Sequence, residues 1–427
     1  MSGVGMWIVI SRDRVDGCGQ ASDMITRHTL AGIAALFLAA SSVLAAEWHR
    51  WRGPDANGIS TEKVEPWADA GPKVLWKAEV GLGFSSISVA NGRAYTMGYH
   101  TGADVVTCID VSNGKVLWEH SSPGLKMENV YEGGPNATPT VDGDTVFTFR
   151  RRGNAYALDA KTGKLLWEVD LARQLKTKMP EWGFSSSPFI EGDLVILNLG
   201  SAGVGLNKKT GAVVWKSGPD ASGYATPVPF DFKGKHFIAL FAKQELVALD
   251  PRTGTVAWRH PWRTQDDINA ADPVIIGDTL LLSSGDNRGG TALQLTEGAP
   301  KVRWENKNLR AQFTPPVVLG GFIYGLDGNA GERATLRCIE LATGEVKWTG
   351  PPVGTGGILA ANNRLLVLSD KGELLLCDAT PAAFKPLARA QILEGKCWTN
   401  PALNAGRLFA RNARGTLVCL QLQPAKD

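Results

Sequence analysis

The stretch ALDAKTGKLLWEVDL, residues 157–171, shows how this chain is built. An apolar run meets Asp159, then Thr162 and Gly163, and a second apolar run follows that carries Trp167. The carboxylate of Asp159 is suited to accept hydrogen bonds from the turn amides, and Gly163 suits the left-handed backbone that such a turn needs. The stretch therefore predicts two antiparallel strands joined by a hairpin.

The same pattern recurs along the chain: an acidic or amide residue, Gly four positions later and Trp eight positions later. A degenerate copy ends at Trp304, and an isolated apolar segment contains Trp76. The intervals between successive tryptophans are 42–49 residues. Each Trp is predicted to lie on an outer strand and to dock against the next unit, burying roughly 150–250 Å². The predicted docking residues are Trp76, Trp118, Trp167, Trp215, Trp258, Trp304 and Trp348.

A second marker precedes each copy: a small or polar residue, often Thr-Pro or Ser-Pro, then a strand, a turn and another strand. It occurs eight times, for example as ATPTVDGDTVFTF and TNPALNAGRLFAR. Units of four strands with this period are typical of the blades of a β-propeller. The last unit, from Thr399, supplies only three strands, and VLWKAEV (74–80) supplies the missing outer strand. The sequence therefore predicts an all-β, eight-bladed propeller whose ring is closed by the N-terminal strand.

The ends of the chain and its composition limit the function classes. Residues 24–46 combine a basic start, an apolar middle and small residues, which predicts a secretory signal peptide cleaved after Ala45 or Ala46. Residues 1–23 are interpreted as an over-extended N-terminus, 47–71 as an extension and 72–427 as the propeller. We expect an exported, periplasmic or extracytoplasmic monomer without a membrane span in its mature part. The net charge of +3 gives no support for a nucleic-acid partner.

Five cysteines follow the predicted signal peptide. Cys108, Cys338 and Cys419 occupy matching places in three repeats, and Cys377 is one residue off. This shared place predicts small buried core residues rather than a disulfide framework. Cys397 stands apart, beside Trp398.

The pattern A-x-D-x-x-T-G-x-x-x-W, present as ALDAKTGKLLW (157–167) and nearly as ALDPRTGTVAW (248–258), resembles the tryptophan-docking repeat of quinoprotein dehydrogenases. It is equally the repeat of PQQ-like propellers that bind no quinone, including the BamB-type assembly factors. The similarity covers residues 72–427. WHRWRGPDANGIS (48–60), GFSSSPFIEGD (183–193) and GKCWTNPAL (395–403) look like an exported bacterial group of such proteins.

The resemblance implies a propeller and leaves two activities open. Quinone-binding members pair the repeat with adjacent cysteines, a calcium site of acidic and amide ligands, and a catalytic Asp. This chain has no Cys-Cys dipeptide and no Cys-x-x-Cys-His haem motif. We therefore favour a non-catalytic propeller that binds a protein or carbohydrate through its top face, without a cofactor. The alternative is an oxidoreductase that uses PQQ and calcium on a small alcohol or sugar.

The default binding site of a propeller is the channel mouth, where the loops before the inner strands meet those between the middle strands. Two interpretations of these loops stay open: stacking platforms and polar groups for a sugar or peptide, or the ordinary polar loops of any propeller. The loops also hold Phe84, Asn136 and Arg151, and the triplet Arg150–Arg152 is interpreted as solvated. The candidate pocket residues are Trp182, Ser185, Tyr224, Thr226, Lys243, Asn269, Asp272, Arg288, Gln312, Trp398 and Asn400.

No catalytic residue is assigned, and no metal site is predicted. Asp266, Asp267, Asp272 and Asp286 would supply carboxylates for calcium if they clustered at one loop face. Solvated loop carboxylates are the favoured interpretation. The histidines do not show the spacing of a zinc site.

Overall fold

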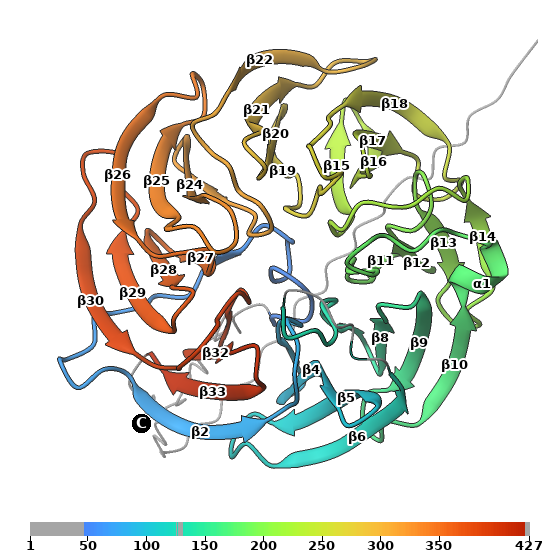
Figure 1. Ribbon diagram of the computed structural model, residues 1–427, viewed down its shortest axis with the longest axis horizontal. Coiled ribbons are helices and arrows are strands. Elements are labelled where there is room, and N and C mark those ends of the chain that lie inside the picture. Colours follow the sequence, from blue (N-terminus) through green and yellow to red (C-terminus); the bar gives the residue numbers. More distant parts are fainter. Residues whose placement is uncertain (1–46, 125, 127–130, 423–427) are drawn as a thin grey trace, which may run out of the picture. The chain divides into compact units, whose positions relative to one another are not determined.

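The computed structural model describes residues 47–124, 126 and 131–422, so the predicted signal peptide and residues 1–23 lie outside the described residues. The described residues form eight antiparallel blades, which we number in chain order from the first inner strand. The blades stand around a central axis with their first strands innermost (Figure 1). This arrangement confirms the predicted eight-bladed propeller.

The strands of blades 1 to 4 follow in chain order from the channel outward. Blade 1 consists of β3 (Ser88–Ala90), β4 (Arg93–His100), β5 (Ala103–Asp110) and β6 (Val116–Pro123). Blade 2 consists of β7 (Thr140–Asp142), β8 (Thr145–Phe149), β9 (Asn154–Asp159) and β10 (Leu165–Asp170). Blade 3 consists of β11 (Phe189–Glu191), β12 (Leu194–Leu197), β13 (Val204–Asn207) and β14 (Val213–Lys216). Blade 4 consists of β15 (Val228–Phe232), β16 (Lys235–Phe241), β17 (Glu245–Leu249) and β18 (Val256–Pro261).

Blades 5 to 8 repeat this order. Blade 5 consists of β19 (Val274–Ile276), β20 (Thr279–Ser284), β21 (Gly289–Gln294) and β22 (Lys301–Asn306). Blade 6 consists of β23 (Val317–Leu319), β24 (Phe322–Asp327), β25 (Thr335–Glu340) and β26 (Val346–Pro352). Blade 7 consists of β27 (Gly357–Ala361), β28 (Arg364–Leu368), β29 (Glu373–Asp378) and β30 (Pro386–Gln391). Blade 8 takes three strands from the C-terminal end, β31 (Ala402–Asn404), β32 (Arg407–Arg411) and β33 (Thr416–Gln421).

The N-terminal strand closes the ring as predicted. β2 (Lys73–Glu79) pairs antiparallel with β33, with Trp76 opposite Cys419. Figure 1 shows the blue β2 lying outside the red β33. Closing the ring between strands far apart in sequence gives the C-terminal blade its outer partner, which removes an unpaired edge.

The tryptophan seams explain the repeat. Six of the seven predicted indoles donate Nε1–H to a backbone carbonyl in the next blade, as Trp118 does to Ala160 at 3.1 Å. The Trp118 ring also lies on the next turn glycine, because a Cβ added at Gly163 would stand 2.5 Å from its Cε3. Gly163 has φ +72°, so the position requires glycine for its backbone and for the indole. Trp258, facing the degenerate turn of blade 5, has no acceptor within the described residues.

The extension predicted at 47–71 has a structural role that the sequence did not reveal. Its short strand β1 (Ile59–Ser60) pairs parallel with β27 as a fifth, innermost strand of blade 7. Earlier in the segment, the carbonyl oxygen of Trp48 accepts from Val89 and that of His49 accepts from Val141, at 2.7 and 2.8 Å. The blue chain therefore crosses the centre of the ring in Figure 1, bonded to the inner strands of several blades.

We call the end of the ring that carries the loops before the inner strands the top face, and the opposite end the bottom face. The extension meets the bottom-face turns, where Glu62 accepts from the amides of Ala405 and Gly406 at 2.9 and 2.6 Å. Residues 47–64 thus enter the channel from the bottom face. All five cysteines of the described residues are buried with free thiols, and the one helix among them is α1 (Leu171–Leu175).

Candidate functional site

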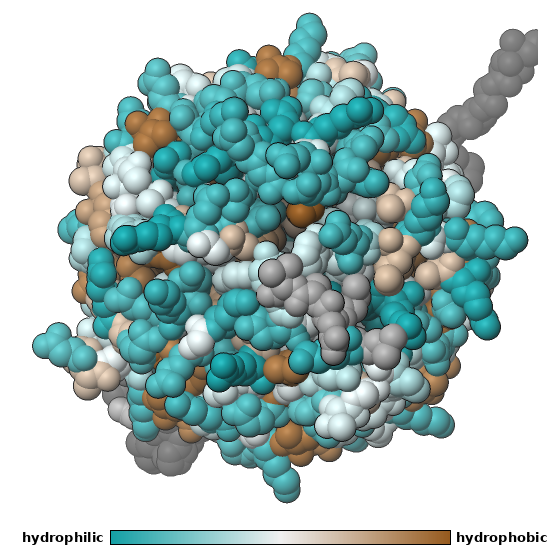
Figure 2. All heavy atoms as spheres, in the orientation of Figure 1, coloured by the Kyte–Doolittle hydropathy of each residue, from teal (hydrophilic) through white to brown (hydrophobic). Residues whose placement is uncertain are grey.

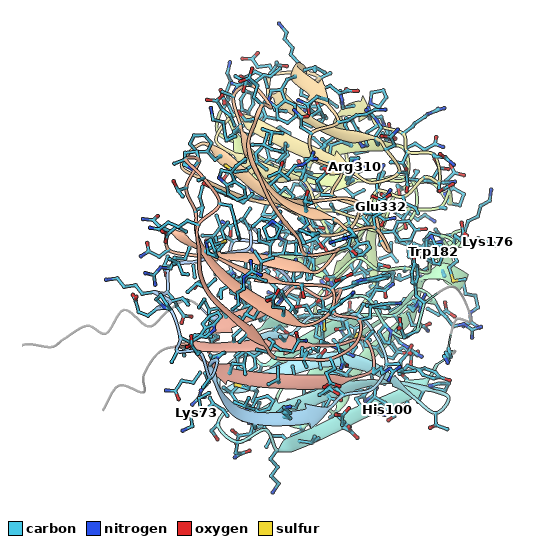
Figure 3. All side chains as sticks on the ribbon, turned by 60° about the vertical axis from the view of Figure 1, so that its left-hand side comes forward. Lys73, His100, Lys176, Trp182, Arg310 and Glu332 are labelled. Carbon is cyan, nitrogen blue, oxygen red and sulfur yellow. The ribbon has the colours of Figure 1, made fainter. Side chains whose placement is uncertain are left out.

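A cavity of ≈ 210 Å³ opens at the centre of the top face. Figure 2 looks onto this face, where hydrophilic residues predominate and a hydrophobic residue is visible near the centre. Figure 3 shows Trp182 on the same side of the molecule as His100, away from Lys73 at the start of β2. The cavity is lined by Trp51, Phe84, Tyr131, Gly133, Asn136, Arg151, Trp182, Ser185, Ser187, Tyr224, Thr226, Ile268, Ala270, Asp272, Gln312, Phe313 and Trp398.

Seven of the lining residues are aromatic, and Trp398 contacts three of the others. Its ring stacks on Phe84 with centroids 5.8 Å apart and an interplanar angle of 23°. Tyr131 meets Trp398 edge-on at 4.9 Å and also contacts Trp182 at 5.5 Å. Phe313 lies 5.4 Å from Trp398 on a further side. These rings come from loops between five different pairs of blades, so only the closed ring brings them together.

The floor of the cavity is an indole bonded to a buried carboxyl group. Trp51, from the extension in the channel, donates Nε1–H to Oδ2 of Asp272 at 2.6 Å. The amide of Thr226 donates to Oδ1 of the same carboxyl at 2.7 Å. Burial raises the pKa of Asp272 to about 6, although the nearby Arg52 guanidinium opposes this rise. Asp272 is therefore an acid whose ionisation falls close to neutral pH.

A belt of side-chain oxygens explains the Ser-Pro and Thr-Pro markers. The amide of Ser86 donates to Oγ1 of Thr138, that of Thr138 to Oγ of Ser187, and that of Ser187 to Oγ1 of Thr226, at 3.0–3.1 Å. Each hydroxyl thus ties the preceding blade to its own blade at the start of the inner strand. The amide of Thr226 continues the belt to Asp272. Blade 5 therefore has a carboxyl group where blades 2 to 4 have a hydroxyl.

Two amide side chains on the walls have one end already bonded to the protein. Asn136 donates Nδ2–H to Oγ of Ser185 at 3.0 Å, which leaves Oδ1 as an acceptor. Oε1 of Gln312 accepts from the amide of Ala330 at 2.7 Å, which leaves Nε2 as a donor. The walls therefore offer both a donor and an acceptor to a polar ligand.

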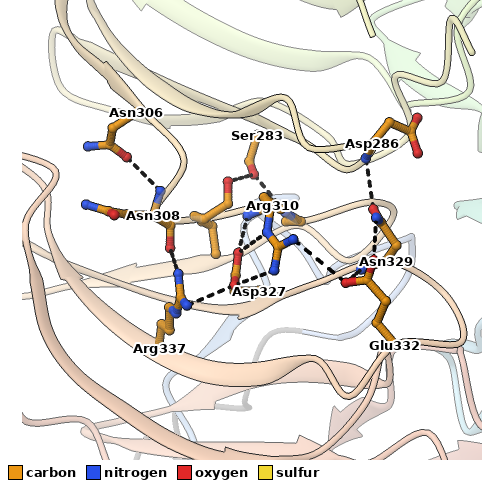
Figure 4. Close-up of polar contacts among 11 residues, drawn as sticks. Ser283, Asp286, Asn306, Asn308, Arg310, Asp327, Asn329, Glu332 and Arg337 are labelled. Atoms are coloured by element: carbon orange, nitrogen blue, oxygen red, sulfur yellow. Dashed lines mark hydrogen bonds and ion pairs between the residues drawn. The ribbon is translucent and has the colours of Figure 1, made fainter. Parts of the chain in front are cut away.

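The loop that orients Gln312 is held by a cluster of charged residues (Figure 4). Nη2 of Arg310 and Nη2 of Arg337 lie 3.0 and 3.1 Å from Oδ2 of Asp327, whose side chain is almost fully buried. Glu332 pairs with Arg310 at 3.8 Å, and Asn329 donates to Glu332 within the same loop. The charged hydrogen bonds of this cluster fix residues 328–334, including the amide that meets Gln312.

Arg151 ties two walls together. Its Nη1 donates to the carbonyl oxygen of Gly134 at 2.8 Å and its Nη2 to that of Trp182 at 3.0 Å. The interpretation of Arg150–Arg152 as a solvated triplet is wrong for two of its members, since Arg150 and Arg151 are only 4% and 5% exposed. Arg150 pairs with Asp104 at 3.0 Å, and burial lowers the pKa of Arg151. Carbonyl oxygens from neighbouring loops and the carboxylate of Asp104 in β5 make this burial tolerable.

The structure brings seven of the eleven predicted pocket residues into the cavity wall. They are Trp182, Ser185, Tyr224, Thr226, Asp272, Gln312 and Trp398. The other four lie elsewhere. Lys243 pairs with Asp267 at 3.0 Å, and Arg288 covers the Trp262 ring at 3.5 Å.

The remaining two residues of that prediction are structural as well. Asn269 is fully buried and donates Nδ2–H to the carbonyl oxygens of residues 242, 243 and 262. Asn400 accepts from the amide of Ile358 at 2.9 Å and from the hydroxyl of Ser86 at 2.7 Å. In the structure both side chains connect blades, and neither lines the cavity.

Sequence reasoning missed three lining aromatics. Trp51 lies in the extension, where no repeat indicates that it reaches the channel. Tyr131 and Phe313 lie in loops between blades, and Phe313 directly follows the predicted Gln312. An aromatic residue next to a predicted loop residue was a signal that could have identified Phe313.

The donor set at the cavity does not fit a calcium-bound quinone. Asp272 is the cavity's carboxylate among the lining residues, and each of its oxygens already accepts a hydrogen bond. In the part of the chain that the structure describes, no three His, Cys, Asp or Glu side chains are grouped to hold a metal ion. Asp267 faces Lys243 and Asp272 faces Trp51, so the four aspartates considered for calcium do not form one site.

Comparisons with known proteins place the chain among related propellers. Residues 102–350 match the model of a family described as outer membrane protein assembly factor BamB. A search of curated protein sequences found no match. Among the residues that are described, no helix is long and apolar enough to cross a membrane.

Solved structures share the fold at low sequence identity. BamB from Moraxella catarrhalis aligns with a TM-score of 0.60 and 19% identity, over 82% of this chain and 99% of that one. Quinohemoprotein alcohol dehydrogenase from Comamonas testosteroni gives 0.64 and 14%, over 89% and 81%. A europium-containing methanol dehydrogenase gives 0.65 and 14%, over 86% and 89%. At these identities the likeness concerns the fold.

Proposed function

The chain belongs to the family of the outer membrane protein assembly factor BamB, and from this premise we propose that it is a non-catalytic propeller that binds a carbohydrate in its top-face cavity. The observation that carries the proposal is the cavity itself. Partly buried aromatic side chains line a space that also offers amide, hydroxyl and carboxyl groups. Sugars need this combination, since their C–H faces stack on aromatic rings while their hydroxyls both donate and accept hydrogen bonds.

The proposal does not include catalysis. Asp272 accepts from Trp51 and Thr226, so its oxygens serve the connection between floor and blade. Glycoside hydrolysis uses a pair of carboxyl groups about 5–10 Å apart, whereas Asp272 is the one carboxyl group among the described lining residues. A bound quinone with calcium would need further acidic ligands, and the described lining residues do not provide them.

We further propose that the protein acts outside the cytoplasm, on the basis of the predicted signal peptide. The family name describes an assembly factor of the outer membrane, and a protein partner is the second candidate on that account. The cavity favours carbohydrate over protein, because ≈ 210 Å³ holds a single ring more readily than a peptide segment.

The test is a screen of the purified protein against an array of neutral oligosaccharides, followed by calorimetric titration of the best binder. Replacing Trp182 with Ala should weaken binding about tenfold, which corresponds to about 1.4 kcal/mol of lost stacking. The matched control is Lys243→Ala, on the same face and outside the cavity wall, which should leave the affinity unchanged. Equal losses in the two variants, or the absence of any saccharide binding, would overturn the proposal.

The quinoprotein alternative has its own measurement. The protein is mixed with PQQ and calcium, and the absorption spectrum and dye reduction with alcohols and aldoses are recorded. We expect neither a bound-quinone spectrum nor turnover. Dye reduction that depends on both PQQ and an alcohol would replace the carbohydrate proposal with the oxidoreductase one.

A further inference from the structure

The cavity has no exit through the ring. Trp51 forms its floor, and behind it Arg52 is 2% exposed and donates Nη2–H to the carbonyl oxygens of Asn57 and Pro316, both at 2.7 Å. The chain then continues into β1, which pairs with β27 on the channel side of blade 7. The extension therefore occupies the channel below the cavity, and a chain-like ligand is unable to thread through the propeller.

The size of the cavity sets the next limit. Pockets for drug-sized ligands measure about 300–1,000 Å³, and this one measures ≈ 210 Å³. Its deepest polar groups are those of Ser187, Thr226 and Asp272, all buried, whereas Trp182 and Trp398 nearer the mouth are half-buried. A ligand that reaches the deep groups must enter the cavity end-on.

The charges around the mouth of the cavity indicate which kind of ligand end the cavity binds. Lys396 pairs with Glu132 at 2.8 Å and lies over the Trp398 ring at 4.4 Å. The two Nη atoms of Arg151 are bonded to carbonyl oxygens, and its Nε is buried. These cations are therefore engaged within the protein, and an anionic sugar gains no cationic partner from them. The remaining polar groups of the cavity suit hydroxyls.

From these three observations, and resting on the proposed function, we infer that the cavity binds the terminal residue of a neutral glycan chain and not an internal stretch. The terminal ring lies between the aromatic walls with its hydroxyls toward Gln312, Asn136 and Asp272. The rest of the chain leaves through the mouth into solvent. The protein therefore binds the ends of glycan chains. Each glycan chain provides one binding position for every end that the cavity recognises.

The experiment titrates the full protein with linear glucose, mannose, galactose and N-acetylglucosamine oligosaccharides of one to six residues. For a series that binds, the affinity should change less than about threefold beyond two residues, because only the terminal ring enters. Blocking the recognised end should weaken binding about tenfold or more. The non-reducing end is blocked as a benzylidene acetal, and the reducing end as a methyl glycoside. An affinity that rises steadily with length, or equal binding after either end is blocked, would overturn the inference.

A variant distinguishes the contribution of the terminal sugar ring to the affinity from that of the remaining glycan chain. Replacing Gln312 with Ala should weaken the monosaccharide and the hexasaccharide by the same factor, since both place the same ring in the cavity. Lys243→Ala should change neither. A loss confined to the monosaccharide would show that longer chains bind elsewhere and would overturn the inference while leaving saccharide binding intact. Failure of every saccharide to bind would instead overturn the proposed function, and this inference with it.

Discussion

Two sets of tryptophans in this molecule have the same side chain and different surroundings. In the outer set, Trp167 and Trp348 are 9% exposed, each indole N–H is bonded to a carbonyl oxygen, and the rings lie in the seams between blades. In the inner set, Trp182 and Trp398 are half-buried, and their described ring contacts are with Tyr131, Phe84, Phe313 and the Lys396 ammonium. An indole paired on its face and its N–H stabilises the fold, whereas one with a face open to a cavity is available to a ligand.

The largest effect should come from removing an outer indole. Trp167→Ala should lower the free energy of unfolding by about 3–5 kcal/mol, because it leaves a cavity in the seam between blades 2 and 3. The measurement is denaturant unfolding, with saccharide affinity measured on the folded fraction. Trp182→Ala is the matched variant and should show the reverse, a weaker affinity with little change in stability. If both variants lose stability equally, the distinction between the two sets is wrong.

The next effect concerns the glycine beneath an outer indole. Gly163→Ala should cost about 2 kcal/mol, since φ is +72° and the new Cβ would overlap the Trp118 ring. Gly234→Ala is the matched control, because Gly234 has φ +73° and an added Cβ there meets nothing within 4 Å. It should lose only the cost of the left-handed backbone, about 1 kcal/mol. Similar losses at both positions would show that turn strain, and not the indole, decides.

A third tryptophan, Trp51 at the cavity floor, should make stability depend on pH, because its indole is bonded to a carboxyl group and not to a carbonyl oxygen. The pKa of Asp272 is raised to about 6 in the folded protein, above its usual value of 3.8. The folded state therefore holds a proton that the unfolded state has lost, and stability should fall as pH rises from about 4 to about 6. Each tenfold difference in proton affinity is worth about 1.4 kcal/mol.

The test of this pH dependence compares unfolding of the wild type and Asp272→Asn between pH 4 and 7. The stability of the wild type relative to the variant should decline across this range. Asp159→Asn is the control and should show no pH dependence in this range, because hydrogen bonds from Thr162 lower the pKa of Asp159 and its contribution is lost only as pH falls below about 4. A constant difference between the wild type and Asp272→Asn would contradict the prediction.

The smallest effect should distinguish two outer indoles from each other. Trp167→Phe removes the N–H that donates to Lys208, whereas Trp258→Phe removes no bond of this kind within the described residues. Both variants lose similar ring area, so Trp167→Phe should be about 1 kcal/mol more destabilising, the net worth of one hydrogen bond. Equal losses of unfolding free energy in the two variants would show that the buried ring area alone stabilises the seams.

The fold was largely predictable because its signals are local and repeated. The spacing from Asp159 to Gly163 and Trp167 identified one hairpin, and its recurrence identified the blades. The missing fourth strand at the C-terminal end indicated how β2 closes the ring. The path of residues 47–64 was not predictable, because a segment without a repeat has no periodicity that relates it to the blades.

The candidate site was predictable in part. Residues such as Trp182 and Trp398 were identified because every loop before an inner strand ends near the axis. Asn400 comes from such a loop and Lys243 from a loop between two middle strands, yet Asn400 connects blades and Lys243 turns to Asp267. Loop position fixes where the backbone lies, while the available partners decide where a side chain points.

By itself, the sequence determined the number of blades, the closure of the ring and the role of the outer tryptophans, because each depends on contacts that recur with a fixed period. Tertiary structure alone decided the floor at Trp51, the burial of Arg151 and the convergence of rings around Trp398. Those features join residues far apart in the chain, and they exist only after the closed ring has brought the loops and the extension to one axis.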